Sequence, residues 1–335
     1  MTVLPADQLQ SLAVALAEAG YRVVAPVRRG PVVRFEPWCP EDVIVAAGVP
    51  VNSVKDVVFP PAEVIGRAGL EGDGFTLEEV APEATPTVAL LVRPCDAAAL
   101  TVLDRVLGGA PADVFYTARR GTLTVVGLAC DTADEHCFCT SVGGAPGATV
   151  NLDLRLLPAA GGDRYLVEAL SRKGEEVVAV GDVVWGQGEA DPAPLAEVPV
   201  RFDAAAVTGW LAGNFDHPLW REVSLECLGC GACAFACPSC HCFDVQDEAS
   251  RTRAVRRRTW DACALGLFTL HASGHNPRPD QSARWRQRVM HKLAYLPARQ
   301  DVLGCSGCGR CSRLCPNGLT IAEACQRITA LAARP

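Results

Sequence analysis

Two cysteine runs in the C-terminal third constrain this chain more than any other feature of its sequence. Each has the spacing Cys-x2-Cys-x2-Cys-x3-Cys-Pro, the first spanning Cys227 to Pro238 and the second Cys305 to Pro316. Gaps of two residues let three thiolates of one loop bind three corners of a single iron–sulfur cube. The fourth cysteine of each run lies too far round the turn and binds the other cube. The two runs therefore predict two [4Fe–4S] clusters.

Cross-ligation between the runs, which are of the bacterial ferredoxin type, divides their cysteines into two ligand sets. The first cluster is assigned to Cys227, Cys230, Cys233 and Cys315, and the second to Cys305, Cys308, Cys311 and Cys237. Zinc is the alternative, but zinc sites are built from paired Cys-x2-Cys units with four ligands for each ion. Two complete runs favour clusters.

Composition narrows the class of protein further. The chain has 335 residues, 49% of them hydrophobic, so it can bury a sizeable core in two or three domains. Disulfide frameworks belong to short secreted chains, so thiolate–metal chemistry explains its 17 cysteines better. The net charge of −7 argues against a nucleic-acid binder. An amphipathic helix is expected over Met1 to Gly20, with no signal peptide and no membrane span, which predicts a cytoplasmic protein.

The first two hundred residues have an α/β pattern. A buried strand over Val88–Val92 precedes a helix from Ala97 to Leu107 with Asp96 as its N-cap, and Leu123–Leu128 is the next strand. This order predicts a parallel βαβ unit. Further strands are expected near Val23, Leu154, Leu166 and Val177. No glycine-rich nucleotide-binding motif follows a strand.

We therefore predict an α/β domain over residues 1–200 and a dicluster domain over residues 201–335, joined by a Gly- and Pro-rich linker at 181–200. The second domain is expected to be mostly α-helical and ferredoxin-like. It contains a long insert between the two cysteine runs, the 67 residues from Pro238 to Gly304. This insert is expected to fold over the dicluster core.

A third group of cysteines lies in the N-terminal domain. Cys130, Cys137 and Cys139 follow one predicted strand, and Cys95 follows the neighbouring strand. Open α/β sheets place their sites at the carboxyl ends of parallel strands. These four thiols are therefore expected to hold a third [4Fe–4S] cluster. The alternative is that they are small buried residues in tight loops, which explains a Cys-x-Cys pair poorly.

The insert raises two questions that the sequence leaves open. Cys240, Cys242 and Cys263, with His241, are either ligands of another metal or thiols packed beside the clusters. Between residues 251 and 300 there are also eleven Arg or Lys residues and two Asp. Such a basic segment is either a solvated face or a source of positive charge that raises cluster potentials or docks an acidic partner.

Several motifs together resemble a known family. They are Arg93-Pro-Cys-Asp96, Cys130 to Cys139 with Ser141-Val-Gly143, Phe215-Asp216 with Trp220, the two dicluster runs, Cys237-Pro-Ser-Cys-His-Cys-Phe243, Trp260-Asp-x-Cys263 and Ser273-Gly-His-Asn-Pro-Arg278. The chain resembles the beta subunit of cytoplasmic NAD(P)-linked nickel–iron hydrogenases, the sulfhydrogenases, and the A subunit of anaerobic sulfite reductase.

This resemblance implies an electron-relay subunit without catalytic residues of its own. Such a subunit passes electrons between a flavin- and NAD(P)-binding subunit and a catalytic subunit, either a nickel–iron hydrogenase or a sulfite reductase. The alternative from another class is a stand-alone enzyme, or a sulfite or sulfur reductase component. In that alternative Cys240, Cys242 or Cys263 binds substrate beside a cluster.

Overall fold

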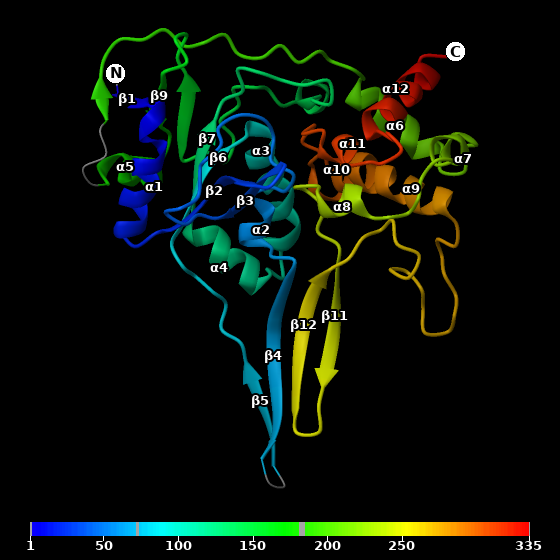
Figure 1. Ribbon diagram of the computed structural model, residues 1–335. Helices are drawn as coiled ribbons and strands as arrows, with labels where there is room; N and C mark the ends of the chain where they lie inside the picture. Colours follow the sequence, from blue (N-terminus) through cyan, green and yellow to red (C-terminus); the bar gives the residue numbers. More distant parts are fainter. Residues whose placement is uncertain (1, 72–73, 181–184, 335) are drawn as a thin grey trace.

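The computed structural model describes residues 2–71, 74–180 and 185–334. Figure 1 shows three regions: a sheet with its helices formed by the N-terminal half, a group of helices formed by the C-terminal part, and a narrow second sheet that extends away from both. Among the described residues, no helix has the length and apolar character that a membrane crossing requires.

An eight-stranded sheet organises the N-terminal half, in the order β10-β1-β9-β8-β7-β6-β2-β3. Its strands are β1 (Thr2–Pro5), β2 (Arg22–Arg29), β3 (Val32–Pro37), β6 (Thr87–Val92), β7 (Leu123–Leu128), β8 (Leu154–Pro158), β9 (Arg164–Ala169) and β10 (Gly186–Gln187). The four central strands β2, β6, β7 and β8 are parallel. The predicted parallel βαβ unit is confirmed, with α3 between β6 and β7.

Helices cover both faces of this sheet. They are α1 (Leu9–Glu18) and α5 (Arg172–Ala179) on one face, and α2 (Lys55–Val58), α3 (Pro94–Leu107) and α4 (Val114–Thr122) on the other. Alternate residues of β6 enter the two cores, since Val88 and Leu90 pack with α1 while Ala89 packs with α3. Burial on both faces explains why the central strands read as continuous apolar runs.

Three local predictions in this half are wrong. Residues 2–5 form β1, paired with β9 and β10, so the helix begins only at Leu9. Val177 lies in α5, whose N-cap Ser171 accepts a hydrogen bond from Gly174 N, and not in a strand. Arg93 is the N-cap of α3, because Pro94 occupies the first helical position. Asp96 instead lies buried in the first turn, paired with a distant arginine.

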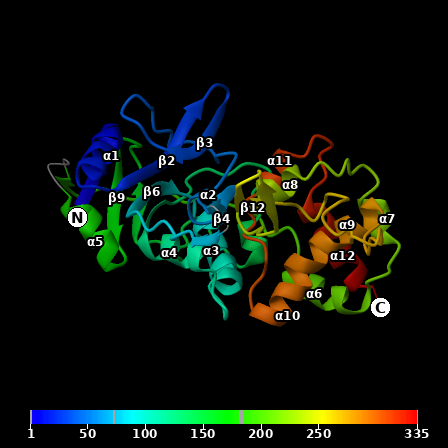
Figure 2. The same cartoon turned by 90° about the horizontal axis from the view of Figure 1, so that it is seen from below.

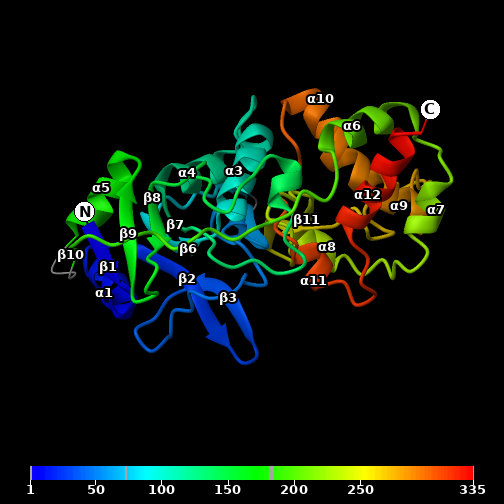
Figure 3. The same ribbon diagram turned by 90° about the horizontal axis from the view of Figure 1, so that it is seen from above.

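The C-terminal part contains the helices α6 (Ala204–Gly213), α7 (Leu219–Val223), α8 (Ala232–Phe235), α9 (Gln281–Met290), α10 (Leu296–Gln300), α11 (Arg310–Arg313) and α12 (Ile321–Ala332), with a π-helical turn at His291–Tyr295. Their core is built around Trp220, Trp285, Val289 and Ile328. The short helices α8 and α11 each begin inside a cysteine run and lie side by side, facing the N-terminal half (Figures 2 and 3).

The prediction of a mostly helical C-terminal domain is not confirmed, because the insert between the cysteine runs contains β-strands. The insert forms the hairpin of β11 (Phe243–Ala249) and β12 (Arg253–Trp260), in a four-stranded antiparallel sheet with β4 (Ala62–Glu71) and β5 (Gly74–Glu79). Because β12 pairs with β4, this sheet contains strands from both halves of the chain.

The predicted linker joins the two halves along the surface. Residues 181–184 of this linker lie outside the described residues. The short strand β10 pairs with β1, and residues 188–200 then cross to α6 without forming a helix or strand (Figure 1). Thr140 Oγ1 donates hydrogen bonds to the carbonyls of Val198 and Pro199. The linker is therefore attached to the cysteine-rich loop of the N-terminal half.

Candidate cluster sites

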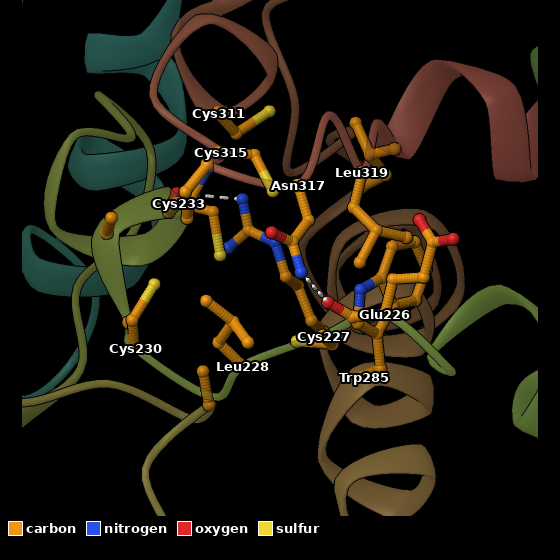
Figure 4. Close-up of a pocket in the computed structure, with 16 residues that line it drawn as sticks. Glu226, Cys227, Leu228, Cys230, Cys233, Trp285, Cys311, Cys315, Asn317 and Leu319 are labelled. Carbon is orange, nitrogen blue, oxygen red and sulfur yellow. Dashed lines mark hydrogen bonds between the residues drawn. The ribbon is translucent and has the colours of Figure 1, made fainter.

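The four cysteines assigned to the first cluster line one cavity. Cys227 and Cys230 reach it from the loop before α8, Cys233 from α8 itself, and Cys315 from the loop after α11 (Figure 4). The glycines between the first three have left-handed backbones, with φ of 68° at Gly229 and 77° at Gly231, which tightens the loop. The structure thus brings together thiols from two segments that are more than 80 residues apart in the sequence.

Donors and an exposed rim surround this first cavity. Gln281 Nε2 donates to the sulfur of Cys227 at 3.1 Å. The buried Arg288 guanidinium lines the cavity and donates to the carbonyl of Cys233 at 2.8 Å. On the rim, Leu228 is 68% exposed and Cys230 is exposed as well. The first site therefore has an exposed rim at the molecular surface.

The four cysteines assigned to the second cluster lie deeper. Cys237 and Cys308 are buried, and burial raises the pKa of Cys305 to about 12 and that of Cys308 to about 11. Thiolates at such positions need a compensating positive charge or metal ion. Lys292 supplies part of it, since its Nζ donates to the sulfur of Cys237 at 3.2 Å.

Lys292 and Arg288 are buried cations without a carboxylate partner among the described residues. Burial lowers the pKa of Lys292, but the nearby Cys237 and Cys240 thiolates outweigh it and raise the pKa above its ordinary value. The pKa of Arg288 is also raised, because Cys233 and Cys240 outweigh its burial. The charge that these two side chains neutralise is therefore that of the cysteines, as the anionic character of an all-thiolate cluster requires.

The four N-terminal cysteines also line one cavity. Cys95 follows β6 and Cys130 follows β7, so two neighbouring parallel strands end at this cavity, and Cys137 and Cys139 complete the lining. A bulge in β6, with Leu91 at a φ of 58°, redirects the chain just before Cys95. The structure thus brings together all four residues of the predicted third ligand set.

This third site lies directly against the second cysteine run. Cys308 lines the same cavity, and Phe138 N donates to the carbonyl of Gly307 at 3.0 Å. A Cβ atom at Gly307 would lie 2.5 Å from the backbone nitrogen of Cys139, and one at Gly309 would lie 2.4 Å from the carbonyl of His136. These glycines thus permit the close approach of the two cysteine-bearing loops.

A fully buried ion pair joins the two halves at this point. Arg310, in the second cysteine run, is 1% exposed, and its side chain forms a bidentate pair with Asp96, which is 0% exposed. Its Nε donates to the carbonyl of Pro50 at 2.7 Å. Sequence reasoning missed Arg310, because nothing near it in the sequence indicates a partner more than 200 residues away.

The remaining cysteines of the insert line a separate, small cavity. Its lining includes Cys240, Cys242 and Cys263 together with His241, as well as Arg288 and Lys292. Lys55 reaches this region from α2, and sequence reasoning missed it as well. Its Nζ donates a hydrogen bond to the carbonyl of Cys240 at 3.3 Å and lies 3.5 Å from the centre of the Trp260 ring.

Mononuclear metal binding finds no support in the described residues, where no group of three or more His, Cys, Asp or Glu side chains could hold a single ion. A four-iron cube presents a different demand, because each thiolate binds a separate iron. Cys39 is exposed, and Cys325 is buried in α12, in the core against which Cys305 and Cys311 pack. Most arginines of the hairpin are paired with acidic residues, among them Arg256 with Asp247 and Arg257 with Glu248.

Comparisons with known proteins agree with this picture. A family model described as a 4Fe-4S dicluster domain matches residues 226–319, which contain both cysteine runs and the hairpin. The chain is 31% identical to the sulfhydrogenase 2 subunit beta of Pyrococcus furiosus, with 90% of each chain covered. No solved structure matches the chain significantly.

Proposed function

Because the chain belongs to the family of the sulfhydrogenase beta subunits, we propose that it is the electron-relay subunit of an oxidoreductase complex. In this role it passes electrons between a flavin- and NAD(P)-binding subunit and a catalytic subunit of the nickel–iron hydrogenase type. When bound, each [4Fe–4S] cluster accepts and releases one electron at a time. The residues of the chain hold these clusters, set the distances between them and balance their negative charge.

The observation that carries the proposal is the continuity of the three cysteine sets. The third set shares its cavity with Cys308 of the second set, and Cys311 of the second set lines the cavity of the first. Neighbouring redox groups with shared walls favour electron transfer between them. We therefore propose a path that runs from the N-terminal site through the buried second site to the first site at the surface.

The proposed ligands form three sets, of which the first and the third each line one cavity, while Cys308 and Cys311 of the second set lie in the walls of those two cavities. They are Cys227, Cys230, Cys233 and Cys315, then Cys305, Cys308, Cys311 and Cys237, and finally Cys95, Cys130, Cys137 and Cys139. The buried charges of Arg288 and Lys292 support this assignment, because each needs a negative counter-charge and no carboxylate within the described residues provides one.

The test is the content of iron and acid-labile sulfide in anaerobically purified protein, together with low-temperature EPR of the reduced form. Three clusters correspond to about 12 irons for each chain, and about 8 irons would restrict the relay to the dicluster. The variant Cys139→Ser is expected to lose about four of the irons. Cys39→Ser is the matched control, because Cys39 is exposed and lines none of the cavities.

The relay role has a separate test. The isolated chain is expected to take up electrons from reduced viologen but to show no hydrogen evolution and no sulfite reduction. Addition of the hydrogenase subunits should restore hydrogen evolution. Turnover of sulfite or polysulfide by the chain alone would overturn the proposal and favour the reductase alternative.

A further inference from the structure

Two thiols outside the three proposed ligand sets face each other at the base of the hairpin. Cys242 directly precedes β11, and Cys263 follows shortly after the end of β12. The pairing of Phe243 with Trp260 is continued by a hydrogen bond of 3.0 Å from Asp261 N to the carbonyl of Cys242. This holds the two segments together, and both side chains line one small cavity.

The cavity that Cys242 and Cys263 line has a volume of about 10 Å³. That is at the lower limit for a single water molecule, so the cavity in this structure has no room for a substrate molecule between the thiols. Chemistry in this cavity is therefore confined to its own side chains and to the electrons and protons that reach them. A two-thiol group needs no more than that in order to be oxidised and reduced.

Both proposed dicluster ligand sets border this pair. Arg288, which lines the small cavity together with Cys263, also lines the cavity of the first set. Lys292, which lines the same small cavity, donates to the sulfur of Cys237 in the second set at 3.2 Å. Two one-electron carriers beside one dithiol match the stoichiometry of a disulfide, which is reduced by two electrons.

We propose that Cys242 and Cys263 form a redox-active pair that cycles between two thiols and a disulfide. Oxidation breaks two S–H bonds and forms one S–S bond, releases two protons to solvent and passes two electrons, one at a time, to iron–sulfur acceptors. Reduction takes two electrons from low-potential iron–sulfur donors and two protons. The supply of electrons rests on the proposed relay function, whereas the thiol chemistry does not. The pair gives a one-electron relay a store for two electrons.

The first experiment counts thiols in the holoprotein. Samples poised with dithionite or with an oxidised viologen are quenched in acid, which releases the clusters, and are then alkylated under denaturing conditions. All 17 cysteines should be alkylated in the reduced sample. In the oxidised sample two should be protected, and peptide mapping should join Cys242 to Cys263. Complete alkylation in both samples, or a link through Cys240, would overturn the proposal.

The second experiment counts electrons. In an anaerobic reductive titration, Cys242→Ser and Cys263→Ser should each take up about two equivalents fewer than the wild type. Their iron content should be unchanged, and Cys39→Ser should behave as the wild type does. A loss of about four irons in either variant would identify these thiols as ligands of a further cluster and would overturn the proposal. Wild-type protein with intact cluster EPR signals but no protected thiols would refute the pair while leaving the relay function standing.

Discussion

At the scale of single residues, buried cations decide how the cysteines can be charged. Lys292 contacts the sulfur of Cys237, the hydroxyl of Ser239 and the carbonyl of Gly304, all three within 3.2 Å. Its ammonium group is fixed, because three acceptors use its three protons. A positive charge in this position stabilises the reduced, more negative form of a cluster and so raises its reduction potential.

Replacement of this charge gives the first prediction. Lys292→Met is expected to lower the reduction potential of the cluster bound by Cys237 by on the order of 100 mV, because a unit charge a few ångströms away acts with roughly 3–4 kcal/mol. EPR-monitored redox titration measures this shift. Lys292→Arg keeps the charge and serves as the control. An unchanged potential in the methionine variant, with iron content intact, would show that the charge is screened.

Cross-ligation makes a second prediction at this scale. Cys315→Ser should remove or convert the cluster on Cys227, Cys230 and Cys233, because Cys315 lines their cavity although it belongs to the other cysteine run. The cluster on the second run should survive. Iron analysis and EPR of the variant distinguish the two clusters. Loss of the second cluster alone would show that each run binds its own cube.

At the scale of elements, the third site depends on how closely two loops approach. The loop at residues 136–139 lies against the second cysteine run. The approach is so close that a side chain at position 307 or 309 would clash with the backbone of this loop. The hydrogen bond from Phe138 N to the carbonyl of Gly307 fixes the register of this contact. The two loops therefore form one unit, although each by itself looks like an ordinary cysteine-rich turn.

A glycine substitution tests this contact. Gly307→Ala is expected to displace Cys139, whose backbone nitrogen lies 2.5 Å from the new Cβ, and to cost the protein about four irons. Gly318→Ala is the matched control, since its φ of 69° is nearly that of Gly307 at 68° but its Cβ would meet nothing within 4 Å. Both variants carry the same backbone strain. Equal iron contents in the two variants would contradict the proposed third site.

At the scale of the whole molecule, a shared sheet, an aromatic contact and a buried ion pair help to join the halves of the chain. The pairing of β12 with β4 makes one sheet of both, and Phe59 stacks on Trp260 with ring centres 6.0 Å apart. The Arg310–Asp96 pair is buried between them. The predicted domain boundary at residue 200 thus marks a change in the sequence pattern. The side-chain packing between the two halves continues across this boundary.

The buried pair provides the prediction at this scale. Asp96→Asn leaves the Arg310 guanidinium without its counter-charge and is expected to destabilise the protein by about 3–5 kcal/mol. Thermal unfolding of the holoprotein should show a midpoint lower by several degrees. Asp163→Asn removes an exposed partner of Arg164 and should leave the midpoint nearly unchanged. Equal midpoints would mean that Arg310 is compensated by other groups.

The sequence by itself determined the features that depend on short spacings. The cysteine runs indicated both dicluster ligand sets, because three thiols of one loop can reach one cube only at such gaps. The strands over Val88–Val92 and Leu123–Leu128 could be predicted, since a strand buried on both faces needs an uninterrupted apolar run. Their order along the chain also indicated that Cys95 and Cys130 lie at the same edge of the sheet.

Only the tertiary structure decided the contacts between distant segments. It turned the insert into a hairpin, because its strands pair with β4 from the other half of the chain. It moved Asp96 from a predicted N-cap to a partner of Arg310, and it placed Lys55 beside Cys240. No local pattern encodes such pairs, since a buried charge selects its counter-charge by distance in space and not along the chain.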